Sequence, residues 1–233
     1  MENLRIMVAV PTHDQHPAMF GYDLAQMMAF TVANLMGGQK PPIAAVNLAY
    51  CTGTYIHSAR QELAEVAMEQ GADFVLWLDS DMRFPKDLLA RLLKHNEDLV
   101  GVNYSQRKVP PEFVAIKDML KGQRCVTAPE STGLEQVEGI GFGGVLMRTA
   151  ILGRLPDPKE NGPWFFYRWR DDTKTMVGED IYFGELLAEA GVKILVDHDL
   201  SKECRHIGTF EYGVEHAMTS YEKVEPDGPD NEQ

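Results

Sequence analysis

The sequence predicts an α/β fold in one domain, residues 1–221, with a mostly parallel central sheet in the first half and a mixed arrangement in the second. Two observations predict it. Short apolar runs of strand type alternate with amphipathic segments of helical periodicity, which is the pattern of a parallel sheet covered by helices. The 233 residues, 44% of them apolar, are also enough to bury one sizeable core.

The first half predicts three buried strands separated by two helices. Pro11 ends the first strand because proline has no N–H for a ladder, and Gly71 ends the second helix because glycine readily adopts the left-handed conformation. The expected elements are strand 5–10, helix 21–36 followed by Gly37-Gly38, strand 43–49, helix 55–70 and strand 73–78.

The second half is more mixed. The expected elements are helix 85–94, strand 99–102, antiparallel segments 112–116 and 134–147 with glycine-rich joints, helix 178–190 closed by Gly191, and strand 193–196. Residues 222–233, EKVEPDGPDNEQ, are predicted to be a disordered tail because proline, glycine and acids leave little to bury.

Net charge, cysteine spacing and the length of the apolar runs limit the classes of function that the sequence allows. A formal net charge of -13 argues against broad contact with nucleic-acid phosphates, which needs clustered Lys and Arg, so nucleic acid stays open only as an acceptor. Three cysteines, Cys51, Cys125 and Cys204, form no C-x-x-C pair, so neither a disulfide framework nor a zinc ribbon is indicated. Because neither a leader of signal type nor an apolar run of about 18 residues is present, the expectation is a cytoplasmic protein.

The main chemical signal is Asp79-Ser80-Asp81, which follows directly on the apolar run DFVLWL. In an extended segment the two carboxylates project to the same side, spaced to share a hydrated cation and a ribose or phosphate. They also fall at the carboxyl end of a strand, the edge where open α/β sheets bind ligands. A solvated turn is the alternative, although a buried strand rarely ends in two acids that have no partner.

These residues belong to a series that resembles the GT-A glycosyltransferases, a Rossmann-like α/β fold. The resemblance is to the family-2-like bacterial and phage enzymes and, more distantly, to the mannan-polymerase group. It spans residues 5–208 and rests on several motifs in order. They are Val10-Pro11-Thr12, Arg60, Asp79-Ser80-Asp81, GVNYSQR at 101–107, GIGFGGVLMR at 139–148, Pro163-Trp164-Phe165, Gly178-Glu179-Asp180 and His206-Ile207-Gly208.

The resemblance implies a metal site. Asp81 would be a direct ligand, Asp79 would contact the ion through water or bind the donor ribose, and His206 would be the third protein ligand. Imidazole, carboxylates and diphosphate oxygens suit Mn²⁺, with Mg²⁺ as the alternative. His198 is the competitor for the histidine position, but Asp197-His198-Asp199 is expected to be an exposed turn.

The resemblance also implies the donor site, with uridine as the commonest base and a UDP-sugar as the expected donor. Glycines 141, 143 and 144 would let the backbone approach the donor sugar, although a bulge or tight turn explains them equally well. The expected donor-binding residues are Pro11, Thr12, Asp14, Arg60, Asp79, Ser80, Asp81, Gly143 and Gly144. For Arg60, a surface ion pair on a solvated helix face is the alternative.

Glu179 and Asp180 lie at a predicted helix start, where the dipole and free N–H groups favour an ionised carboxylate. A plain helix cap is the simple explanation. In an inverting enzyme of this family, Asp180 would be the general base and Glu179 would hold donor or acceptor hydroxyls. Trp164 and Phe165 would form an aromatic platform for the acceptor, and burial in the core is the alternative for both.

The predicted function is therefore metal-dependent transfer of a sugar from a nucleotide sugar to a hydroxyl acceptor. The acceptor is a glycan, a protein, a small molecule or, if the source is a phage, a hydroxylated DNA base. Two other classes stay open. A nucleotidyltransferase uses a similar domain but normally carries a Gly-rich, basic signature after the first strand, which Pro11-Thr12-His13-Asp14 lacks. An inactive nucleotide-sugar-binding module of the same fold is the other.

Overall fold

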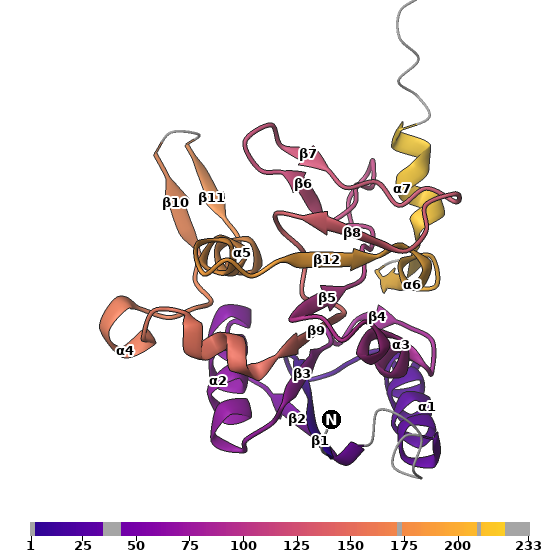
Figure 1. The fold of residues 1–233 in the computed structure, drawn as a ribbon. Coiled ribbons are helices and arrows are strands. Elements are labelled where there is room, and N and C mark those ends of the chain that lie inside the picture. Colours follow the sequence, from indigo (N-terminus) through magenta and orange to yellow (C-terminus); the bar gives the residue numbers. More distant parts are fainter. Residues whose placement is uncertain (1–2, 35–42, 172–173, 209–210, 222–233) are drawn as a thin grey trace, which may run out of the picture.

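A seven-stranded sheet in the order β2-β1-β3-β9-β5-β12-β8 forms the centre of the molecule (Figure 1). The computed structural model describes residues 3–34, 43–171, 174–208 and 211–221. The strands of this sheet are β1 (Leu4–Pro11), β2 (Ile43–Cys51), β3 (Phe74–Trp77), β5 (Leu99–Gly101), β8 (Leu134–Val137), β9 (Val145–Arg148) and β12 (Ile194–Asp197).

Strand directions divide this sheet into two halves. Strands β1, β2 and β3 are parallel to one another. Strand β9 then pairs antiparallel with both β3 and β5, β12 runs parallel to β5, and β8 closes the edge antiparallel to β12. This arrangement confirms the predicted α/β class, mostly parallel at first and mixed afterwards.

Helices cover both faces of the sheet (Figure 1). Successive residues of β1 alternate between the two cores, because side chains in a strand point to opposite faces. Ile6 and Val8 pack with the helices α1 and α3, whereas Met7 and Ala9 pack with α2 and α5. The helices are α1 (Ala18–Asn34), α2 (Ile56–Glu69), α3 (Leu88–His95), α4 (Pro158–Asn161), α5 (Glu179–Glu189), α6 (His198–Ser201) and α7 (Val214–Tyr221), with a 3₁₀ helix at Thr149–Arg154.

Three small sheets accompany the main one. They are β10 (Arg168–Arg170) with β11 (Thr175–Val177), β6 (Ile116–Asp118) with β7 (Gln123–Arg124), and β14 (Glu211–Tyr212) with β13 (Arg205–Ile207) and β4 (Met82–Arg83). In the described part of the chain, no helix combines the length and the apolar character that a bilayer crossing needs.

Several boundaries differ from the expectation. Helix α3 begins at Leu88 rather than Pro85. Pro85 lies in the turn before the helix, where its carbonyl accepts from the Leu88 N–H at 3.1 Å. The expected segment 134–147 is two strands, β8 and β9, separated by the glycine-rich run. The predicted glycine stop at Gly71 is confirmed, with φ of 62°. Gly37-Gly38 and the predicted tail 222–233 lie outside the described residues.

Candidate functional site

A cleft of about 390 Å³ lies where predicted, beyond the carboxyl end of β3. Its walls come from the ends of β1 and β3, from α2, from the start of α5 and from β13. The lining residues are Pro11, Thr12, His13, Thr54, Ile56, Ala59, Arg60, Asp79, Ser80, Asp81, Arg107, Glu179, Asp180 and His206. Nine residues predicted from the sequence are therefore brought together on one cleft.

Strand pairing brings His206 to the aspartates. The chain after Asp81 forms β4, which pairs antiparallel with β13 and places His206 opposite Met82. The Ile207 N–H also donates to the Asp81 carbonyl at 2.8 Å. On the other side, Asp23 of α1 accepts from the side chain of Arg83 at 2.6 Å, which holds β4 against the helix layer.

Asp81 and His206 form the pair best arranged to hold a cation. The His206 Nδ1–H donates to the Ser105 carbonyl at 3.0 Å, which turns Nε2 toward Asp81 Oδ1, 3.4 Å away. An imidazole oriented in this way by a backbone carbonyl is the usual arrangement of a metal-binding histidine. Burial alone raises the pKa of Asp81, but His206 and the Arg107 guanidinium, 2.8 Å from Oδ2, hold it below its usual value.

Asp79 does not join that pair. Its Oδ1 accepts from Arg60 at 2.8 Å, and Arg60 also contacts Glu179 Oε1 at 2.5 Å. Arg60 is only 3% exposed, so the alternative of a solvated surface position is wrong. Burial alone lowers the pKa of Arg60. Three carboxylates, Asp79, Glu179 and Asp180, raise that pKa by more than burial lowers it, so the guanidinium stays charged. One buried cation therefore joins the end of β3 to the start of α5.

Asp180 departs from the expectation for a helix start. Burial raises its pKa to about 6, and the Glu179 charge adds to this although Arg60 opposes it. Its Oδ1 accepts one hydrogen bond, from the Ile181 N–H at 2.8 Å. The prediction that the helix start favours the ionised form is corrected for Asp180, because desolvation outweighs the dipole.

Five predicted site residues lie outside the cleft lining. Asp14 is exposed and pairs with His13 at 3.1 Å. The Gly143 N–H donates to the Tyr104 hydroxyl at 3.1 Å, and a Cβ at this position would lie 2.7 Å from that ring. A Cβ on Gly144 would meet Val102 at the same distance. Close packing therefore accounts for both glycines.

The two predicted acceptor aromatics, Trp164 and Phe165, belong to the core. Trp164 is 4% exposed and donates to the Pro156 carbonyl at 2.8 Å. Phe165 is fully buried and stacks on Phe183 with ring centroids 4.3 Å apart. The exposed aromatics are the next two residues along the chain, Phe166 and Tyr167.

Some lining residues had no role in the sequence prediction. Arg107 ends the GVNYSQR motif, and its charge was the available signal. His13, Thr54, Ile56 and Ala59 carry no local signature, and their place in the cleft follows only from the packing of α2 beside β1.

His198 corrects another expectation. The Asp197-His198-Asp199 segment was expected to be an exposed turn, yet His198 is 3% exposed and begins α6. The Asp197 side chain, also buried, caps that helix through the Leu200 N–H at 2.9 Å. His198 contributes nothing to the cleft lining and contacts Thr127 and Glu135 instead.

The fold is shared with a solved viral protein. A197 from STIV matches with a TM-score of 0.58 at 12% identity, over 88% of this chain and 86% of that chain. A structure of GalNAc-T7 with UDP, GalNAc and Mn2+ matches with a TM-score of 0.46 at 11% identity, over 84% of this chain and 43% of that chain. No family model and no characterised protein matches the sequence. At that identity the match to A197 shows a shared α/β fold.

Proposed function

We propose that this protein is a metal-dependent glycosyltransferase that moves a sugar from a nucleoside diphosphate sugar to a hydroxyl acceptor. The observation that carries the proposal is the Asp81–His206 pair, with the imidazole Nε2 turned to the carboxylate, in the same cleft as Thr12, Glu179 and Asp180. A structural turn does not require this convergence of β1, β3, α5 and β13.

The residues fit a divalent cation, Mn²⁺ or Mg²⁺. Asp81 and His206 would hold it directly, Asp79 would reach it through water or bind the donor ribose, and donor diphosphate oxygens would complete the coordination. The ion would neutralise charge that develops on the departing nucleoside diphosphate. Arg107 already contacts Asp81, so a second positive charge lies where that diphosphate would bind.

Asp180 is our candidate general base for an inverting transfer. It would accept the acceptor hydroxyl proton while the oxygen bonds to the anomeric carbon and the bond to the diphosphate breaks. A carboxylate whose pKa is raised to about 6 is a better base near neutral pH than an ordinary aspartate. Glu179, fixed by Arg60, would hold a sugar hydroxyl rather than exchange protons.

For the donor we propose a uridine nucleotide sugar, bound along Pro11 and Thr12. The acceptor would lie against Phe166 and Tyr167 rather than the buried Trp164 and Phe165. His57 contacts Tyr167 with ring centroids 5.3 Å apart, and burial and the nearby Glu179 charge raise the Tyr167 pKa. Tyr167 therefore lies beside the Glu179 carboxylate, and the apolar face of its ring suits a sugar.

A thermal-shift panel of nucleoside diphosphates and nucleotide sugars, each with Mn²⁺, Mg²⁺ or EDTA, tests the proposal. A nucleotide that binds the folded protein at a hundredfold excess over Kd should raise Tm by roughly 5–10 °C. We expect that rise to need the metal and to disappear in Asp81→Asn and His206→Gln.

The matched control is Asp118→Asn, an aspartate outside the cleft, which should respond as the wild type does. Release of nucleoside diphosphate from the selected donor, followed at saturating metal, then measures turnover. No shift with any nucleotide, or an equal shift in Asp81→Asn, would remove the basis of the proposal.

A further inference from the structure

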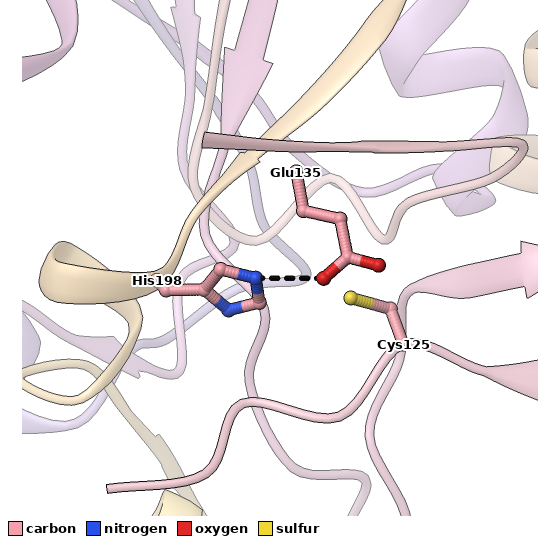
Figure 2. A group of neighbouring side chains, drawn as sticks. All are labelled: Cys125, Glu135 and His198. Carbon is pink, nitrogen blue, oxygen red and sulfur yellow. Dashed lines mark hydrogen bonds and ion pairs between the residues drawn. The ribbon is translucent and has the colours of Figure 1, made fainter. Parts of the chain in front are cut away.

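A second group of metal-ligating side chains lies away from the cleft, in the second half of the sheet. Cys125 follows β7, Glu135 belongs to β8, and His198 begins α6; we call these three residues the thiol cluster. One ligand atom from each lies within 4.8 Å of the others, and Figure 2 shows the three side chains converging. None of the three lines the cleft described above.

The thiol cluster is enclosed but accessible. Cys125 is fully buried and His198 is 3% exposed, whereas the Glu135 side chain is 31% exposed. Glu135 Oε2 accepts from His198 Nε2 at 3.0 Å, and its other oxygen is held by Lys117 at 2.5 Å. Two ligand atoms are therefore fixed inside the protein, and the third lies at the solvent boundary, where an ion would enter.

The hydrogen bonds around His198 allow its ring to bind a cation. His198 Nδ1 lies 2.9 Å from the Thr127 hydroxyl, which also accepts from the Asn103 side-chain amide at 3.0 Å. A hydroxyl both donates and accepts, so Thr127 serves either tautomer of the ring. With the proton on Nδ1 and donated to Thr127, Nε2 has a free lone pair directed at Glu135 and Cys125.

The Asn103 amide is itself fixed, because its oxygen accepts from the Ala115 N–H at 3.0 Å and its nitrogen donates to the Cys125 carbonyl at 2.8 Å. The second layer that orients a metal-binding histidine is thus already in place. One thiolate, one imidazole and one carboxylate form a mixed soft and hard set, which suits zinc better than the oxygen-preferring Mg²⁺.

We propose that Cys125, Glu135 and His198 form a zinc site, separate from the cleft, with a structural role. The ion would join the loop after β7, the edge strand β8 and the start of α6, which are distant in the sequence. The chain runs from His198 through α6 directly to β13, which carries His206. A cation here would therefore brace the segment that presents that histidine, and the proposal depends on no part of the proposed function.

The test uses the full chain, stripped of metal with EDTA and titrated with Co²⁺. A thiolate–cobalt bond gives a near-ultraviolet charge-transfer band, which the Asp81–His206 pair cannot produce because it has no sulfur. We expect one equivalent of Co²⁺ to give the band in the wild type, and Zn²⁺ to abolish it by displacing cobalt. Cys125→Ser should lose the band, and Glu135→Gln should bind at least tenfold more weakly.

Two matched controls should keep the band: Cys204→Ser, which removes another buried thiol, and Asp81→Asn, which alters the cleft. Glu135→Gln keeps the test valid if Cys125→Ser does not fold, because Glu135 lies at the surface of the cluster. The proposal is overturned if the wild type gives no band, if the band persists in Cys125→Ser, or if Glu135→Gln binds Co²⁺ as tightly as the wild type. A band lost in Asp81→Asn would overturn the separation of the two sites.

Discussion

The cleft and the thiol cluster both bring ionisable side chains together, but they differ in how charge is paired within them. In the cleft, the carboxylates of Asp79, Asp81 and Glu179 face the guanidinium groups of Arg60 and Arg107. In the thiol cluster, burial and the Glu135 charge raise the pKa of the Cys125 thiol to about 12 in the metal-free protein.

The difference shows how charge is placed in this fold. Cleft acids occur as near neighbours in the chain, 79 with 81 and 179 with 180, at the ends of buried elements where ligands bind. Their charges are paired with two cations, the buried Arg60 of α2 and the exposed Arg107 of the segment after β5. The thiol cluster instead has a single carboxylate, Glu135, whose charge is paired with the solvent-accessible Lys117. Removing one partner of an ion pair should therefore lower the free energy of unfolding most in the cleft.

The largest expected effect comes from Arg60→Met. This change leaves Asp79 and Glu179 without the cation that both contact, in a position that is 3% exposed. Loss of one partner from a buried ion pair destabilises by roughly 3–5 kcal/mol. Urea unfolding at pH 7 measures the loss in the free energy of unfolding.

Arg91→Met is the matched control, because Arg91 pairs with Glu203 at 2.6 Å on the surface. It should change the free energy of unfolding by less than about 1 kcal/mol. Equal losses in the two variants would show that the Arg60 network does not differ from a surface pair.

Asp180→Asn should produce a smaller change of the opposite sign. The folded-state pKa of Asp180 is raised from 3.8 to about 6, so its ionisation destabilises the fold as pH rises through 6. Since one pKa unit corresponds to about 1.4 kcal/mol and the side chain is partly open to solvent, the neutral asparagine should gain about 2 kcal/mol at pH 7.5. Below pH 3.8 the gain should vanish.

Urea unfolding of Asp180→Asn and of the wild type at pH 3.5, 5 and 7.5 gives the pH dependence of the difference in stability. Asp118→Asn is the control, because the Lys121 side chain holds the pKa of Asp118 below its usual value. The Asp118→Asn variant should show no gain in stability at neutral pH. A pH-independent difference for Asp180→Asn would contradict the role of burial in raising this pKa.

Much of the fold and most of the cleft could be predicted from the sequence, because their signals are local. An apolar run that ends in Asp79-Ser80-Asp81 places two acids at a strand end without any knowledge of partners. The pairing of β4 with β13 could not be predicted in this way, since both strands are too short to show periodicity. The motif resemblance supplied His206 instead.

Burial is the part that sequence reasoning misjudged. Trp164 and Phe165 stand in a run of four consecutive apolar and aromatic residues, and nothing local distinguishes them from the exposed Phe166 and Tyr167. The polar segment Asp197-His198-Asp199 resembles a surface turn, yet two of its members are buried because Leu200, Thr127 and Glu135 supply partners. Such partners come from distant segments, so the thiol cluster has no local signature.

The smallest effect should be that of Glu135→Gln in the metal-free protein. The Lys117 side chain lowers the Glu135 pKa despite the opposing effect of burial, so this carboxylate stabilises the fold above about pH 4.5 and loses that contribution in acid. Both partners are solvent-accessible, and we expect a loss below about 1 kcal/mol at pH 7 that disappears near pH 3. The glutamine amide oxygen can still accept from His198. A loss as large as that of Arg60→Met, measured by the same urea unfolding, would show that the thiol cluster holds buried charge as the cleft does.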